Sequence, residues 1–80
     1  NELKIYPNPV FSSFQLQTPK DHLHGEIIIL NIIGHQIFKK TITKKLTNID
    51  LSNFDKGSYF IFYQKENKSW INKLIKLDTY

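Results

Sequence analysis

Short stretches in which apolar and polar residues alternate run through most of the chain, separated by breaks rich in glycine, proline or polar residues. Alternation with a period of two is typical of strands that bury one face, because successive side chains of a strand point to opposite sides. In one such stretch Phe14 and Leu16 alternate with Gln15 and Gln17. The spacing of the breaks is typical of a β-sandwich, and the pattern predicts about seven short strands, at residues 3–6, 13–18, 26–32, 35–42, 48–51, 58–64 and 69–77.

Residues 26–32 depart from this alternation, because they are apolar on both faces. This predicts a central strand that is covered from both sides, and the pattern alone leaves its register open. Gly34 follows and is expected at a turn with positive φ that returns the chain as a hairpin. Gly57 is expected at a second turn of this kind.

The remaining segments are shorter and more polar. Residues 19–25 are predicted to form a polar loop, and residues 66–68 a turn. Ile49 and Leu51 are expected to point into the core, with Phe54 closing its end. No segment shows a sustained helical period.

Composition favours one small, strand-rich domain. The 80 residues include no Ala, Met, Cys or Arg, and Ile, Phe and Tyr are abundant, which disfavours helices and favours pleated strands. A chain of this length has room for one modest core. It does not begin with Met, which suggests a piece cut from a longer product, and no apolar run reaches the roughly 18 residues that a membrane span requires.

The net charge of +4 comes entirely from Lys. A basic surface can attract nucleic acid, but the bidentate Arg contacts that usually read bases and clamp phosphates are impossible here, so nucleic-acid binding is not predicted. The pairs Lys39–Lys40 and Lys44–Lys45 flank a predicted hairpin. We interpret them as protection of strand edges against pairing with other chains.

Two arrangements of polar residues suggest chemistry only weakly. Asp21, His22 and His24 resemble part of a metal site, but the segment reads as a solvated loop and lacks a further ligand. Ser12 or Ser13 with His35 and Asp50 can be written as a catalytic triad, without any motif that marks a nucleophile. We therefore predict no enzymatic activity, no metal and no cofactor.

Aromatic residues outnumber the places expected for them inside so small a core. An exposed group of them would mark a protein contact or a platform for sugar stacking, whereas packing between neighbouring strands is the simpler interpretation. The residues concerned are Phe38, Phe60, Phe62, Tyr63 and Trp70.

The segment Tyr6-Pro7-Asn8-Pro9 is the most informative motif. A residue before proline is pushed out of the helical region, so this segment is a stiff elbow with few donors that ends one strand and starts the next. Further along, the chain reads Asn31-Ile32-Ile33-Gly34, Ile49-Asp50-Leu51, Gly57-Ser58-Tyr59 and Lys73-Leu74-Ile75-Lys76. In this order and spacing, over nearly the whole chain, the motifs resemble the type A C-terminal sorting domain of the type IX secretion system.

The resemblance implies an all-β fold, a single immunoglobulin-like antiparallel β-sandwich that spans residues 1–80 and belongs to a larger exported protein. Following the family pattern, Ile27 and Ile29 are expected to point inward. The family motifs at the elbow and the turns are expected to hold the structure, namely Tyr6, Pro7, Asn8, Pro9, Asn31, Gly34, Gly57 and Tyr59.

The resemblance also implies a function in protein transport. The domain would fold in the periplasm behind an upstream cargo domain, be recognised by the type IX translocon, and be removed by a sortase-like peptidase as the cargo reaches the cell surface or the medium. The expected recognition surface is the last strand, with Lys73, Lys76 and Leu77, whose polar side chains should face solvent. The alternative is an immunoglobulin-like adhesion or carbohydrate-binding module.

Overall fold

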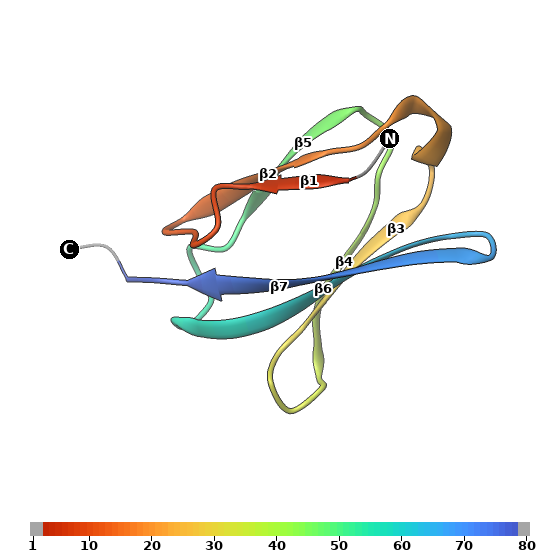
Figure 1. Ribbon diagram of the computed structural model, residues 1–80. Coiled ribbons are helices and arrows are strands. Elements are labelled where there is room, and N and C mark those ends of the chain that lie inside the picture. Colours follow the sequence, from red (N-terminus) through yellow and green to blue (C-terminus); the bar gives the residue numbers. More distant parts are fainter. Residues whose placement is uncertain (1–2, 79–80) are drawn as a thin grey trace.

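Seven strands and one short 3-10 helix make up the computed structural model, which describes residues 3–78 (Figure 1). All seven predicted strands are confirmed, with small shifts at their ends. The elements are β1 (Lys4–Tyr6), β2 (Ser13–Gln17), η1 (Lys20–His22), β3 (Glu26–Leu30), β4 (Gln36–Thr41), β5 (Leu46–Asp50), β6 (Gly57–Lys65) and β7 (Lys68–Lys76).

The strands form two sheets. One has three strands in the order β1-β2-β5, and the other has four in the order β4-β3-β6-β7. Neighbouring strands are antiparallel in both sheets. The predicted antiparallel β-sandwich is therefore confirmed, and β7 lies at one edge of the larger sheet (Figure 1).

The core lies between the two sheets and is built from the inward residues of the alternating segments. Phe14, Leu16, Ile27 and Ile29 are fully buried, which confirms the inward direction predicted for these residues. Burying such side chains stabilises the fold by about 1.5–3 kcal/mol each. The other buried apolar residues are Val10, Ile42, Ile49, Leu51, Tyr59, Ile61, Tyr63 and Leu74, with Phe54 packed partly against them.

Three features differ from the sequence prediction. The strand predicted at 26–32 ends at Leu30, and Ile32 and Ile33 lie exposed in the turn that follows. Its outward residue Ile28 is only half-buried, because none of the described strands forms a second layer over that face of the sheet. The loop at 19–25 contains η1, which is closed by a hydrogen bond from the backbone N–H of His22 to the carbonyl of Pro19 at 2.9 Å.

Both predicted glycine turns are present. Gly34 has φ 89° and Gly57 has φ 144°, in a region that side chains with a Cβ rarely adopt. The turn at Gly34 is closed by Asn31, whose Oδ1 accepts hydrogen bonds from the backbone N–H groups of Ile33 (3.1 Å) and His35 (2.9 Å). This is the local bonding by which Asn favours turns.

Candidate functional site

The two ends of the motif series meet in the fold. The elbow at Tyr6–Pro9 follows β1 in the three-stranded sheet and crosses to the C-terminal half of β7 in the other sheet. Its two X-Pro peptide bonds, Tyr6–Pro7 and Asn8–Pro9, are cis. Because Pro7 and Pro9 carry no backbone N–H, the side chain of Asn8 supplies the polar groups that the elbow turns toward β7.

Four hydrogen bonds join the elbow and the following Val10 to residues 73–77, at the end of β7 and just beyond it. Asn8 donates from Nδ2 to the carbonyl of Lys73 at 2.9 Å, and its Oδ1 accepts from the backbone N–H of Ile75 at 3.2 Å. Val10 continues the pairing through its backbone, donating to the carbonyl of Ile75 and accepting from the N–H of Leu77, each at 2.8 Å. The outer edge of β7 is therefore covered from Lys73 to Leu77.

The three residues predicted for recognition differ in accessibility. Lys73 is exposed and Leu77 is 39% exposed, as expected for residues offered to a partner. Lys76 is only 5% exposed, so the expectation that it faces solvent is wrong. The physical reason is the strand period: Lys76 lies two residues after the fully buried Leu74 and shares its inward face.

Lys76 lines a depression at the C-terminal end of β7. The depression has a volume of about 500 Å³ and brings together residues of the connection between the elbow and β2, of the β5–β6 connection and of the end of the last strand. Acidic and basic side chains both reach it. Its lining residues are Phe11, Ser12, Ser52, Phe54, Asp55, Lys56, Lys76 and Asp78.

The Gly57–Tyr59 motif supports the same end of the molecule. Gly57 pairs with Lys76 and Tyr59 with Leu74 in the β6–β7 register. Tyr59 is buried, and its hydroxyl donates to the backbone carbonyl of Asp55. Burial raises the pKa of Tyr59, and the nearby negative charge of Asp55 raises this pKa further.

Tyr63 has a comparable position at the other end of β6, which sequence reasoning did not identify. Its hydroxyl donates to the carbonyl of His22 and accepts a hydrogen bond of 3.1 Å from the backbone N–H of Gly25. Burial raises its pKa, although the hydrogen bond from Gly25 acts in the opposite direction. No local signal marks this contact, because Gly25 and Tyr63 are 38 positions apart in the chain.

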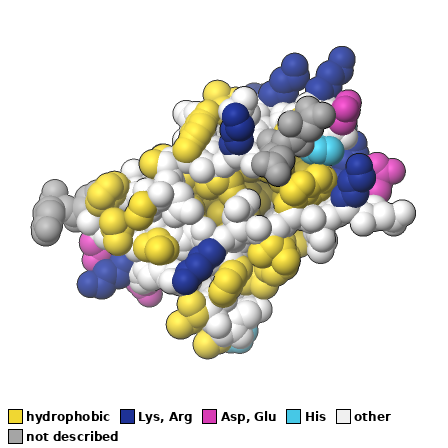
Figure 2. Space-filling model, in the orientation of Figure 1, with side chains coloured by type: hydrophobic (Ala, Val, Ile, Leu, Met, Phe, Trp, Pro, Cys, Tyr) yellow, Lys and Arg dark blue, Asp and Glu magenta, His cyan; other side chains and the backbone are white. Residues whose placement is uncertain are grey.

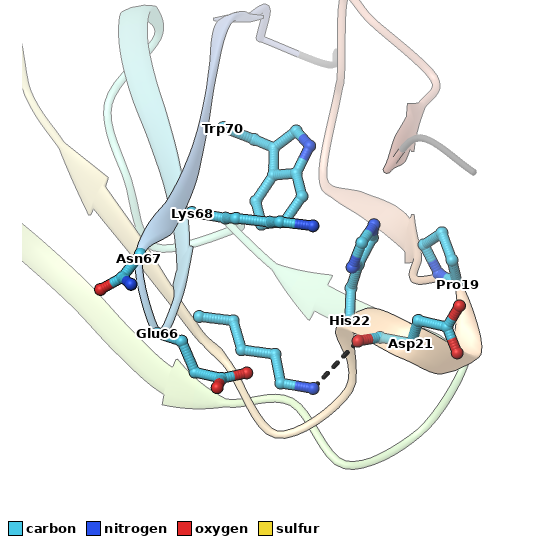
Figure 3. A pocket seen from close by; sticks show the side chains of 8 residues that line it. Pro19, Asp21, His22, Glu66, Asn67, Lys68 and Trp70 are labelled. Atoms are coloured by element: carbon cyan, nitrogen blue, oxygen red, sulfur yellow. Dashed lines mark hydrogen bonds between the residues drawn. The ribbon is translucent and has the colours of Figure 1, made fainter.

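A second depression of about 490 Å³ lies between η1 and the β6–β7 turn (Figure 3). The indole of Trp70 borders it, with the ring of His22 at a centroid distance of 4.6 Å. Lys65 donates from Nζ to the carbonyl of Asp21 at 2.9 Å and so ties the two walls together (Figure 3). The other residues of its lining are Pro19, Glu66, Asn67 and Lys68.

The structure does not assemble the weaker sequence candidates for chemistry. Within residues 3–78, no three His, Asp or Glu side chains gather as ligands for a metal ion. Ser13 and Asp50 face each other on β2 and β5, but His35 belongs to the β3–β4 turn of the other sheet. The hydrogen bond from the backbone N–H of Ser52 lowers the pKa of Asp50, as in an ordinary turn. The described residues also contain no helix that is long and apolar enough to span a membrane.

Comparison with known proteins agrees with the motif assignment. The family described as "Secretion system C-terminal sorting domain" matches residues 4–77. The chain is also 33% identical over 57 residues to Beta-agarase A of Zobellia galactanivorans. That alignment includes 71% of this chain and 11% of the relative, so the chain spans about a tenth of the length of that protein. The match over residues 4–77 means that the chain belongs to the family of C-terminal sorting domains of the type IX secretion system.

Proposed function

We propose that this domain, which comprises residues 1–80 of the chain, is the C-terminal export signal of a larger protein. It directs an upstream cargo domain through the type IX outer-membrane translocon after transit through the periplasm. A sortase-like peptidase then removes the domain and can attach the cargo to surface lipopolysaccharide. The domain itself performs no chemistry.

The observation that supports this proposal is the contact between the first and last family motifs. The Asn8 side chain bonds to the backbone of Lys73 and Ile75, so the elbow and the last strand form one surface. A receptor that binds this surface recognises the domain only when the elbow and the last strand have both folded. Such a test is useful for a secretion machine that must distinguish a complete domain from a fragment.

Recognition at this surface uses side chains. The backbone groups between Lys73 and Leu77 already pair with Asn8 and Val10, so they are not available to a receptor strand. Lys73 offers an exposed charge and Leu77 an exposed apolar contact. Lys76 contributes from the edge of the depression at the strand end.

The direct test is transplantation. The whole chain fused behind a periplasmic reporter should deliver the reporter outside the cell in a host with an active type IX system. The same fusion in a strain without the translocon is the control and should remain in the periplasm. A folded fusion that stays in the periplasm of the active host would count against the sorting function.

A substitution within the fusion tests the surface. Lys73→Gln should reduce secretion strongly while the domain remains folded, because the side chain is exposed. Lys68→Gln is the matched control, since Lys68 is an exposed lysine of the same strand outside the covered segment. Equal secretion of the two variants would place recognition elsewhere, with the Tyr6–Pro9 elbow as the next surface to test.

A second candidate function is binding of carbohydrate, which the depression beside Trp70 favours. Sugar rings stack on aromatic side chains, and polar residues such as Asn67 and Glu66 line the same depression (Figure 3). Titration with soluble oligosaccharides, followed by Trp fluorescence, tests this function. A change in Trp70 emission that is lost in Asn67→Ala would support it, and a flat titration would contradict it.

A further inference from the structure

The N-terminal half of β7 has an uncovered edge. β7 pairs with β6 along its entire length, and as the last strand of the sheet it has no second strand partner among the described residues. Asn8 and Val10 bond to the outward backbone groups of Lys73, Ile75 and Leu77. In an antiparallel ladder the direction of these groups alternates along the strand, so those of Ser69 and Ile71 point the same way. Within residues 3–78, no backbone hydrogen bond closes this part of the edge.

The outer face of the sheet beside this edge carries exposed apolar side chains. Ile71 is 62% exposed on the outer face of the sheet, opposite Phe62, which in turn lies opposite Ile28 on β3. Phe60 on the same face is 37% exposed. Figure 2 shows hydrophobic side chains gathered below β7, over the four-stranded sheet and its β3–β4 turn. An added strand would therefore extend an apolar surface that already crosses three strands.

The opposite edge of the same sheet is built differently. On β4 the exposed Lys39 and Lys40 occupy the strand, and Lys39 lies 3.7 Å from Glu26 in an ion pair. Charges in the middle of an edge strand discourage pairing with another chain. β7 has Ser69 and the exposed Ile71 in the corresponding place, so its uncovered half lacks this protection.

Charge indicates what kind of strand fits. Lys68 and Lys73 flank the uncovered segment, both are exposed, and the chain as a whole carries +4. Glu66, in the adjacent turn, is the nearest carboxylate along the chain. A second copy of the chain would bring further lysines to this edge. A segment with acidic residues at its ends and apolar residues between them complements both the charge and the exposed Ile71.

We propose that β7 residues Lys68–Asn72 form a docking edge for an extended segment of a partner protein, with alternating apolar residues and acidic ends. The segment adds a fifth strand to the four-stranded sheet through the backbone groups of Ser69 and Ile71. This is the mode of β-strand addition, in which the backbone provides affinity and alternate side chains provide selectivity. The proposal concerns residues outside the Lys73–Leu77 surface and does not depend on the sorting function.

The test uses the whole chain and a short capped peptide in which Val alternates with Thr between terminal Glu residues. Binding is followed by NMR chemical shifts and amide hydrogen exchange. The amides of Ser69 and Ile71 should shift and become protected, whereas that of Ile75, which already bonds to Asn8, should change little. The same peptide with N-methyl groups on alternate residues keeps its side chains but loses the backbone N–H groups that would pair with β7. It should therefore not bind.

Two variants give the matched comparison. Lys68→Glu should weaken the peptide by about tenfold, because it replaces attraction by repulsion next to the acidic end. Ile71→Thr should weaken peptide binding, because Ile71 lies in the proposed docking edge. Ile33→Thr is the control and should leave binding unchanged, because Ile33 is also apolar and is 70% exposed but lies in the β3–β4 turn.

Four results would overturn the proposal. The first is an absence of chemical-shift changes in β7 at the highest soluble peptide concentration, and the second is shift changes confined to the depression beside Trp70. The third is equal affinity for the N-methylated and the unmethylated peptide. The fourth is amide protection of Ile71 that rises with protein concentration in the absence of peptide. The last result would identify a second copy of the chain as the occupant.

Discussion

The two halves of β7 are held in place by different interactions, although both pair with β6. The C-terminal half is closed along its edge by hydrogen bonds from Asn8 and Val10. The N-terminal half is supported from beneath by aromatic packing, with Trp70 at centroid distances of 5.7 Å from Tyr63 and 4.6 Å from His22. The C-terminal half therefore combines the buried side chain of Leu74 with pairing at its edge, whereas the N-terminal half relies on the packing of Trp70.

This difference would allow one strand to serve the two kinds of recognition that we propose. Where the edge is closed, only side chains such as Lys73 are available to a partner. In the N-terminal half, the packing of Trp70 holds the strand in place, so the backbone groups at its outer edge remain accessible. The length of β7 thus allows a folded surface and an open edge to coexist in a domain too small for separate elements.

The largest expected effect comes from breaking the support under the N-terminal half. A Cβ added at Gly25 would lie 2.5 Å from the backbone oxygen of Gln64 and 2.8 Å from the ring of Tyr63. Because backbone cannot move aside cheaply, Gly25→Ala should lower the free energy of unfolding by about 3 kcal/mol or more. Chemical denaturation measures this change.

The control is Gly34→Ala, where no atom lies within 4 Å of the added Cβ and the cost is limited to strain at φ 89°. We expect a loss of about 1 kcal/mol there. Similar losses in the two variants would show that the contact between Gly25 and Tyr63 does not support this end of the sandwich.

A smaller effect is expected from opening the edge of the C-terminal half. Asn8→Ala removes the hydrogen bonds to Lys73 and Ile75 and should cost about 1–2 kcal/mol. Amide exchange should accelerate at Ile75 and remain unchanged at Trp70, which the elbow does not touch. Asn53→Ala, at an exposed asparagine without a role in the edge, provides the comparison. Uniform acceleration along β7 would mean that its halves are not independent.

The two lysines of the C-terminal half should differ by a smaller amount still. Lys73→Gln should change stability by less than about 0.5 kcal/mol, because its side chain is exposed. Lys76→Gln should cost about 1 kcal/mol through lost packing of its buried stem. Thermal unfolding of the single variants measures both values. A larger loss for Lys73 than for Lys76 would contradict the assigned faces of the strand.

The last prediction uses pH and applies to both halves, because Tyr59 lies opposite Leu74 and Tyr63 opposite Trp70. Both folded pKa values are raised above the ordinary value of 10.0. A tyrosine with a raised pKa contributes stability that is complete below pH 10.0 and is lost as the pH rises through the folded value, since the unfolded chain ionises first.

Stability should therefore fall above about pH 10, and less steeply in Tyr59→Phe and in Tyr63→Phe. Denaturation midpoints measured across this range test the effect, with Tyr6→Phe as the control at a tyrosine that is 39% exposed. A slope equal in all four proteins would show that neither buried hydroxyl is linked to folding.

Much of the fold follows from local pattern. The alternation at Phe14 and Leu16, and at Ile49 and Leu51, predicted strands and their inward faces, because a side-chain period of two depends only on neighbouring residues. Gly34 and Gly57 were predicted at turns for an equally local reason, the freedom of glycine at positive φ. The same period places Lys76 on the face of Leu74, so its burial was available from the sequence although its charge suggested otherwise.

The tertiary structure decided which edges are closed. Asn8 and Lys73 are 65 positions apart, and nothing local to either residue states that they meet. Likewise, the exposure of Ile71 depends on β7 being the last strand of its sheet and on where the elbow stops. The alternation of apolar and polar residues specifies which face of a strand is buried, whereas the partner at the edge of a strand depends on how distant segments pack. For this reason the sequence was sufficient to determine the strands of this domain, and only the tertiary structure determined which surfaces are exposed.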